Sequence, residues 1–172
     1  HNRPLAAPPG GVAHVRVEDS RRALSPLAAA FFGHPSRKLA VIGVTGTDGK
    51  STTVYLIHQL LEALGEASGF FSTVNHQTGS KIRKNSLRQS TPEASEVHAL
   101  LAAMVEAGKR YAVVEATSHG LSERTNRLGD VRFQASVCTN ITHEHLEFHG
   151  TFERYRSDKA NLFRALDRQE EG

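Results

Sequence analysis

A glycine-rich segment, Gly43 to Thr53, has the residue types that bind phosphate groups. It follows an apolar run and precedes a stretch with helical periodicity, so we expect it to connect a buried strand to a helix. Glycines let the backbone of such a turn direct N–H groups at phosphate oxygens, and the helix N-terminus adds a favourable dipole. In this arrangement Lys50 would reach the β- and γ-phosphates of a nucleotide, and the Ser51 hydroxyl would bind Mg²⁺.

The segment departs from the strict phosphate-loop pattern, because Val44 occupies the position of the first glycine and the shorter pattern G-x-x-G-K-S remains. A strand-to-helix turn without a ligand is the alternative. The preceding strand, the following helix and the Lys-Ser-Thr run together favour the phosphate site.

A carboxylate and three histidines follow two further strand-like runs. Glu115 lies at the C-terminal end of a predicted buried strand, where ligands of open α/β sheets bind, so it can hold Mg²⁺ opposite the phosphate loop. A solvent-facing glutamate is the alternative. His143, His145 and His149 occur within seven residues, and the spacing of the last two allows one helical face to bind a metal. Most histidines are solvated or structural, and that alternative stays open.

Lys159 lies on the apolar side of the last predicted helix, four residues after Tyr155 and four before Phe163. Lysine is rarely buried without a partner. One alternative is that its side chain extends to the surface. The other is an active-site amine that burial makes less basic and more reactive.

These residues need strands and helices that alternate along the chain. Apolar runs predict strands and apolar residues at helical spacing predict helices. Pro26 is expected to limit the first helix, while Thr91 and Thr151 are expected to cap the last two. The strands are predicted at 12–17, 39–44, 69–74, 111–116 and 135–139, the helices at 24–31, 51–64, 91–107 and 152–166, and a loop or hairpin at 79–88. This order indicates an α/β fold with a mainly parallel sheet and flanking helices.

The composition narrows the class of protein. The chain has 172 residues, 38% hydrophobic and 23% charged, as in a globular domain. No apolar run approaches the ~20 residues of a membrane span. The formal charge of +3 is scattered, which argues against nucleic-acid binding and suits a small anionic ligand. Cys138 is the single cysteine, which is compatible with a reducing cytosol.

Three separated segments resemble the Mur ligases. Gly43 to Thr53 is similar to their G-V-T-G-T-N-G-K-T-T-T loop, and Glu115 to Leu121 to their E-V-S-S-H-[AG]-L segment. Thr139 to Gly150 resembles T-N-L-[ST]-R-D-H-L-D-Y-H-G, and with the downstream lysine it points to the UDP-N-acetylmuramoyl-tripeptide synthetases. The resemblance extends from about Val15 to Phe163 and implies the P-loop NTPase-like central domain of that family.

The resemblance implies a ligase reaction and roles for particular residues. ATP phosphorylates the D-glutamyl carboxylate of UDP-MurNAc-L-Ala-D-Glu, and the amine of a third amino acid attacks the acyl phosphate. The implied ATP-binding residues are Gly46, Thr47, Asp48, Gly49, Lys50, Ser51 and Thr52. The implied Mg²⁺ ligands are Ser51, Glu115, His145 and Lys159 as a carbamate, and Lys50, Glu115, His145 and Lys159 are the implied catalytic residues. The implied substrate-binding residues are Ser90, Thr91, Thr117 and Arg127, and the loop before Arg127 is two residues longer than in some relatives.

The resemblance also implies a domain division. Residues 1–37 match the end of an N-terminal UDP-binding domain with its linker, and 38–172 match an incomplete central ATP-binding domain without the C-terminal domain. We therefore expect little ligase activity from this piece alone. A cytoplasmic monomer is expected, with UDP-MurNAc-dipeptide and a free amino acid as partners and no nucleic acid or membrane.

Other functions remain open at this stage. Folylpolyglutamate synthase and cyanophycin synthetase share the ATPase core, a non-catalytic nucleotide-binding module would keep only the site, and a zinc hydrolase would use His143, His145 and His149. The sequence leaves the third amino acid open between meso-diaminopimelate, L-lysine and another amine.

Overall fold

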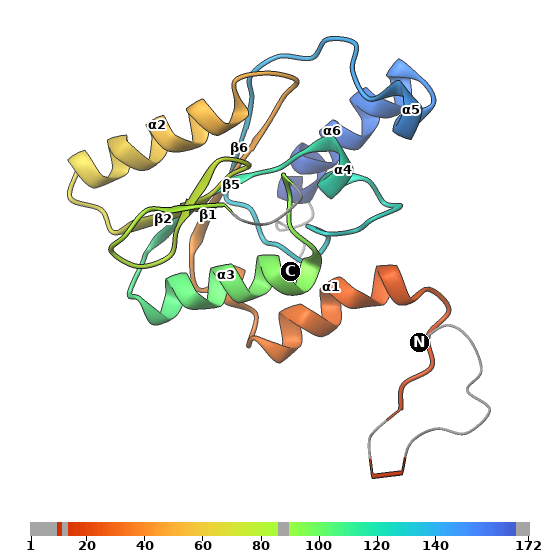
Figure 1. Ribbon diagram of the computed structural model, residues 1–172, viewed down its shortest axis with the longest axis horizontal. Coiled ribbons are helices and arrows are strands. Elements are labelled where there is room, and N and C mark those ends of the chain that lie inside the picture. The colour runs from red at the N-terminus through yellow and green to blue at the C-terminus, as the bar shows by residue number, and fades with distance from the viewer. Residues whose placement is uncertain (1–9, 12–13, 86–89, 168–172) are drawn as a thin grey trace.

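The computed structural model describes residues 10–11, 14–85 and 90–167 (Figure 1). Its centre is a six-stranded sheet in the order β4-β3-β2-β5-β1-β6. The four strands β2, β5, β1 and β6 are parallel, and β3 and β4 add an antiparallel hairpin at one edge. The strands are β1 (Ala40–Thr45), β2 (Ser68–Phe71), β3 (Asn75–Gln77), β4 (Arg83–Lys84), β5 (Tyr111–Glu115) and β6 (Ala135–Cys138).

Helices cover both faces of this sheet. In Figure 1, α2 lies on one face, while α3 and α1 lie on the other. α6 and the short α4 and α5 lie together near the end of the sheet where β1 and β5 finish. The helices are α1 (Ser20–Phe31), η1 (Pro35–Arg37), α2 (Lys50–Ala63), α3 (Ala94–Glu106), α4 (Ser118–Leu121), α5 (Leu146–His149) and α6 (Phe152–Asp167).

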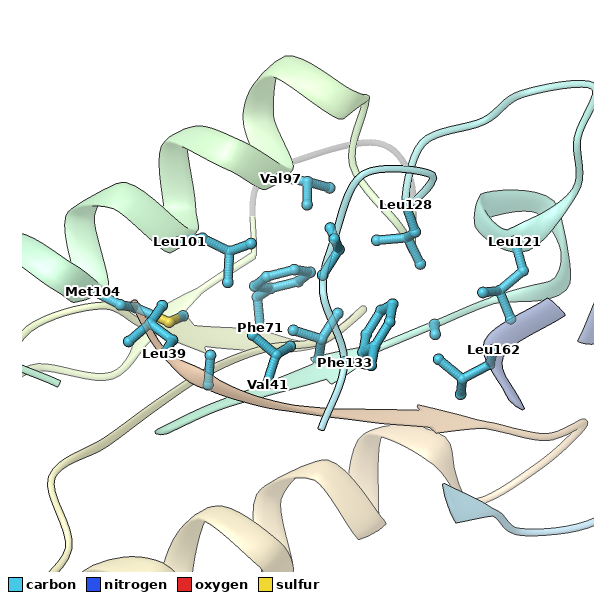
Figure 2. Close-up of a cluster of buried hydrophobic side chains, with 14 residues drawn as sticks. Leu39, Val41, Phe71, Val97, Leu101, Met104, Leu121, Leu128, Phe133 and Leu162 are labelled. Carbon is cyan, nitrogen blue, oxygen red and sulfur yellow. The ribbon is translucent and has the colours of Figure 1, made fainter. Parts of the chain in front are cut away.

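The core is divided between the two faces because successive strand side chains point in opposite directions. Val41, Phe71 and Val114 face α3 and join its Leu101 in the larger cluster (Figure 2). Val44, Phe70 and Val113 face α2 and pack with Val54. The strands are therefore apolar on both sides, which explains their continuous apolar runs and fixes their ends beneath the neighbouring loops.

The predicted fold class is confirmed. The four parallel strands, α2, α3 and α6 all occur within a few residues of their predicted bounds, and residues 75–84 form the hairpin that was one alternative. Residues 86–88 of that prediction lie outside the described residues. The hydroxyl of Thr151 accepts a hydrogen bond from the Arg154 N–H at 3.2 Å, as the predicted cap requires.

Two predictions near the N-terminus are wrong. Residues 14–17 form no strand, and 12–13 lie outside the described residues. Pro26 lies inside α1 and does not limit it. Proline has no N–H to donate to the carbonyl of Arg22, but the Asn126 side chain donates to that oxygen at 3.1 Å. A contact from a distant loop thus compensates for the missing helical hydrogen bond.

Two side chains have different positions from those predicted. Thr91 does not cap α3, which begins after Glu93 in a capping box with Glu96. The Thr91 hydroxyl instead lies 2.8 Å from that of Thr117. Phe163, which was assigned to the inner face of α6, is exposed. Tyr155 and Leu162 alone are fully buried among the five apolar residues predicted for that face.

Gly69 provides a test of the packing between β2 and its neighbours. A Cβ at this position would lie 2.8 Å from the Gln77 carbonyl oxygen and 2.9 Å from the Met104 side chain. Because Gln77 belongs to the adjacent strand backbone, it cannot move without disturbing the sheet. We expect Gly69→Ala to lower the free energy of unfolding by about 1–3 kcal/mol, measured by urea denaturation.

Gly79→Ala is the matched control, because a Cβ there would meet nothing within 4 Å. Equal stability of the two variants would contradict this account of the packing. No helix in the part of the chain that the structure describes is both long and apolar enough to span a membrane.

Candidate nucleotide-binding site

A single pocket of about 800 Å³ lies where β1 and β5 end and α2 begins. Thirteen of the fourteen residues predicted for the site line it, and Gly46 is the exception. The pocket is lined by Thr47, Asp48, Gly49, Lys50, Ser51, Thr52, Thr73, Val74, Ser90, Thr91, Glu115, Thr117, Ser118, His119, Arg127, Glu144, His145 and Lys159. Residues that are up to 112 positions apart in the chain are therefore brought together at one edge of the sheet.

The loop between β1 and α2 is held by the segment that follows β6. The N–H groups of Thr47 and Asp48 both donate to Asn140, at 2.9 Å to its carbonyl and 3.0 Å to its side-chain oxygen respectively. Gly46 has a φ of 147°, and a Cβ there would meet the Thr139 hydroxyl. Gly46 is therefore required by the shape of the loop, although it does not line the pocket.

The first turn of α2 supplies the groups that suit phosphate. The first N–H groups of a helix have no acceptor within the helix, and Gly49, with a φ of 79°, precedes this turn. Lys50 Nζ folds back to donate to the Thr47 carbonyl at 2.6 Å. Because Asn140 uses the Thr47 and Asp48 N–H groups, the amides from Lys50 onward are the better placed for an anion.

Glu115 is buried beside the same turn and is fully hydrogen bonded. Its side chain is 1% exposed and accepts from the Ser51 hydroxyl at 2.6 Å. The N–H and the hydroxyl of Thr73 each donate to the other side of the carboxylate at 2.8 Å. A carboxylate and a hydroxyl at this separation are the oxygen donors that Mg²⁺ prefers, so this pair fits the predicted ion.

Lys159 is buried, as one of the two alternatives predicted. It is 2% exposed, donates to the Gly46 carbonyl, and places Nζ 4.5 Å from the centre of the Tyr155 ring. Burial, and secondly the positive charge of Lys50, lower the pKa of Lys159 to about 8. A larger fraction of its amine is therefore neutral near pH 7 than for an ordinary lysine.

Tyr155 connects α6 to the phosphate loop, and sequence analysis gave it only a packing role. Its hydroxyl lies 2.8 Å from that of Thr47, and burial raises its pKa. Thr73 and Asn140 were also missed. Each follows a parallel strand at its carboxyl end, which is the one signal in the sequence that could have indicated them.

The residues predicted to bind the second substrate form a connected wall of the pocket. The Thr117 N–H donates to the Thr91 hydroxyl at 3.1 Å. Arg127 donates to the Thr91 carbonyl at 3.0 Å and forms an ion pair with Glu93 at 2.9 Å. Ser90 lines the same pocket. A guanidinium beside hydroxyl groups suits a carboxylate or another anion.

The three histidines have three different environments. His145 lines the pocket, has a φ of 55°, and lies 3.6 Å from Glu144 and 3.4 Å from Glu147. His149 is buried, with both ring nitrogens within hydrogen-bond distance of other side chains. His143 stacks on Phe152. His145 precedes α5 in a left-handed conformation, so it does not share a helical face with His149.

This arrangement differs from the predicted zinc alternative. Within the described ranges there is no group of three or more His, Cys, Asp or Glu side chains that could hold a metal ion. His145 with Lys159 would offer only nitrogen donors to Mg²⁺ unless Lys159 carries a carbamate, which would add oxygen donors.

Comparison with known proteins places this pocket in a family. The Mur ligase middle domain matches residues 44–170. UDP-N-acetylmuramyl-tripeptide synthetase of Treponema pallidum is 56% identical over 167 residues, which is 97% of this chain and 31% of that protein. The protein of the same name from a Roseiflexus species is 57% identical and covers 88% of this chain and 30% of its own length.

A solved structure agrees with these sequences. The structure of a UDP-N-acetylmuramoyl-L-alanyl-D-glutamate–2,6-diaminopimelate ligase matches 89% of this chain and 31% of its own chain, with 30% identity and a TM-score of 0.69. The present chain thus spans about a third of the length of the proteins it matches. With its middle-domain match covering most of the residues, the chain belongs to the Mur ligase family.

Proposed function

We propose that this chain is the ATP-binding core of a ligase that adds the third amino acid to UDP-MurNAc-L-Ala-D-Glu in peptidoglycan precursor synthesis. The observation that carries the proposal is the convergence of Lys50, Ser51, Glu115 and Lys159 in one pocket at the start of α2. The names of the Treponema and Roseiflexus relatives support the substrate, since both are tripeptide synthetases.

In the proposed reaction the D-glutamyl carboxylate attacks the γ-phosphorus of ATP, which yields an acyl phosphate and ADP. The amine of the incoming amino acid then attacks the acyl carbon, loses a proton, and the tetrahedral intermediate releases phosphate to form the amide. Lys50 and the N–H groups of the first turn of α2 would hold the β- and γ-phosphates. Arg127, Thr117, Thr91 and Ser90 would hold the acyl substrate.

Ser51 and Glu115 would hold Mg²⁺, which when bound neutralises charge on the phosphates. His145 and a carbamate on Lys159 would hold a second ion. A neutral lysine amine adds carbon dioxide and releases a proton to form a carbamate, and the lowered pKa of Lys159 favours this step. The carbamate would also replace a buried cation with an anion beside Lys50.

We propose the domain division that the resemblance implies, with residues 1–37 ending a preceding domain and 38–172 forming part of the central domain. The proposed partners are the UDP-MurNAc-dipeptide and a free amino acid, and neither nucleic acid nor membrane. A cytoplasmic monomer is the proposed form.

The complete ligase, supplied with ATP, Mg²⁺ and UDP-MurNAc-L-Ala-D-Glu, should form an amide with one member of a panel of amino acids. The panel includes meso-diaminopimelate and L-lysine, and mass spectrometry of the product identifies the residue that is added. Lys50→Ala should remove phosphate release in the same assay, because it removes the charge that faces the β- and γ-phosphates. Glutamylation of a folate, extension of a cyanophycin primer, or nucleotide binding without any ligation would contradict the proposal.

A further inference from the structure

Ser118, His149 and Asp158 form a hydrogen-bonded chain in the wall of the pocket. His149 Nδ1 lies 2.7 Å from Asp158 Oδ2, and its Nε2 lies 3.0 Å from Ser118 Oγ. The imidazole is fully buried and Asp158 is largely buried. Ser118 is 2% exposed, but it lines the pocket between Thr117 and His119.

The order of the three groups determines where their hydrogens lie. An ionised carboxylate can only accept hydrogen bonds, so the contact with Asp158 requires the hydrogen on His149 Nδ1. In the neutral imidazole that leaves Nε2 as an acceptor. The hydroxyl hydrogen of Ser118 then points at Nε2, as in the carboxylate–imidazole–hydroxyl chain of serine hydrolases. What Ser118 presents to the pocket is therefore a lone pair.

This property contrasts with the surroundings of Ser118. Lys50, Arg127 and Lys159 line the same pocket, and all three are hydrogen-bond donors that suit anions. An oxygen whose own hydrogen is committed elsewhere suits the opposite kind of group, an N–H. The proposed reaction brings two such groups into the pocket: the peptide N–H of the acyl substrate and the amine of the incoming amino acid.

We propose that Ser118 binds an N–H group of a substrate through its oxygen, and that His149 and Asp158 are positioning residues that keep it an acceptor. The inference deepens the proposed function and rests on it for the identity of the substrates. His149 ends α5 while Ser118 begins α4 and Asp158 lies in α6, so the chain also connects three helices. A purely structural role would consist of that connection alone.

The first measurement concerns the proton and needs no activity. In the complete ligase labelled with ¹⁵N-histidine, we expect NMR to show His149 with a protonated Nδ1 and an unprotonated Nε2. Asp158→Asn offers an amide N–H to Nδ1 and should move the proton to Nε2. A protonated Nε2 in the wild-type protein would overturn the proposal.

The second measurement concerns the substrate. Ser118→Ala should raise the KM of one N–H-bearing substrate roughly ten-fold and leave the KM of ATP unchanged. Titration of the acyl substrate and of the amino acid separately shows which of them supplies the N–H. Ser122→Ala is the matched control, because Ser122 is also 2% exposed but lies outside the pocket lining.

Two substitutions of His149 separate positioning from structural connection. Glutamine can place its carbonyl oxygen near the position of Nε2 and should keep the KM within about three-fold of wild type. Asparagine reaches only the position of Nδ1, so it keeps the contact with Asp158 and should reproduce the effect of Ser118→Ala.

Unchanged KM values for both N–H-bearing substrates in Ser118→Ala would overturn the inference while the ligase itself remains active. Absence of ligation by the wild-type protein would instead contradict the proposed function, and the NMR result would still decide the position of the proton.

Discussion

Glu115→Gln in the complete ligase is expected to lower ATP-dependent amide formation at least a hundred-fold, a loss of roughly the size found when one preorganised electrostatic group is removed. The amide keeps the size of the side chain, and its oxygen can still accept from the N–H and hydroxyl of Thr73. It removes the negative charge beside Ser51 that would hold Mg²⁺. Phosphate release and product formation, measured across a Mg²⁺ titration, should both fall.

Glu106→Gln is the control for this substitution, because Glu106 is exposed at the end of α3 and far from the pocket lining. It should retain wild-type activity. If Glu115→Gln keeps more than half of the wild-type rate at every Mg²⁺ concentration, Glu115 does not hold the ion. Thermal unfolding of both variants checks that the fold is intact.

Lys159 should change the dependence of stability on pH. Its pKa is about 8 in the folded protein, against 10.5 for an ordinary lysine. Between these two values the unfolded chain keeps the proton that the folded protein has released, so the free energy of unfolding rises with pH across this window. The rise attributable to Lys159 amounts to about 3 kcal/mol, and Lys159→Met should lack it.

The measurement is urea denaturation from pH 7 to 10.5 in buffer free of carbon dioxide, so that no carbamate forms. Lys81→Met serves as the control because Lys81 is exposed, and it should follow the wild-type curve. Parallel curves for wild type and Lys159→Met would show that burial does not depress this amine.

The sequence predicted the central sheet because its signals are local. The runs that became β1 and β5 are apolar throughout, and both are covered by helices on each side. The errors arise where a distant residue overrides a local signal. Pro26 is accommodated by Asn126, and Thr91 is engaged by Thr117 in place of its own helix. Neither contact leaves a periodic trace in the sequence.

A buried histidine shows the same limit. His98 lies on the face of α3 that periodicity assigns to apolar residues, and it is fully buried. Neither ring nitrogen has a hydrogen-bond partner among the described residues, and burial lowers its pKa. Hydrophobic patterning identifies the face of a helix but does not say which polar residues that face will include.

The residues of the site were predicted more completely than their contacts. The convergence of Lys50, Glu115 and Lys159 follows from a motif, a strand end and an unusual position on a helix. The partners that hold them were not predictable, because Thr73 and Tyr155 are chosen by the three-dimensional path of the chain. Their proposed chemical roles stay predictions until the substitutions are measured.

Helix α6 brings Tyr155, Asp158 and Lys159 to three different partners within little more than one turn. Each residue added to or removed from this stretch would rotate everything beyond it by about 100° and break all of these contacts at once. The loop at 122–130 has no comparable constraint on its length. Insertions and deletions among homologous chains should therefore collect in 122–130 and be absent from 155–162, which makes α6 a fixed ruler for aligning distant members of the family.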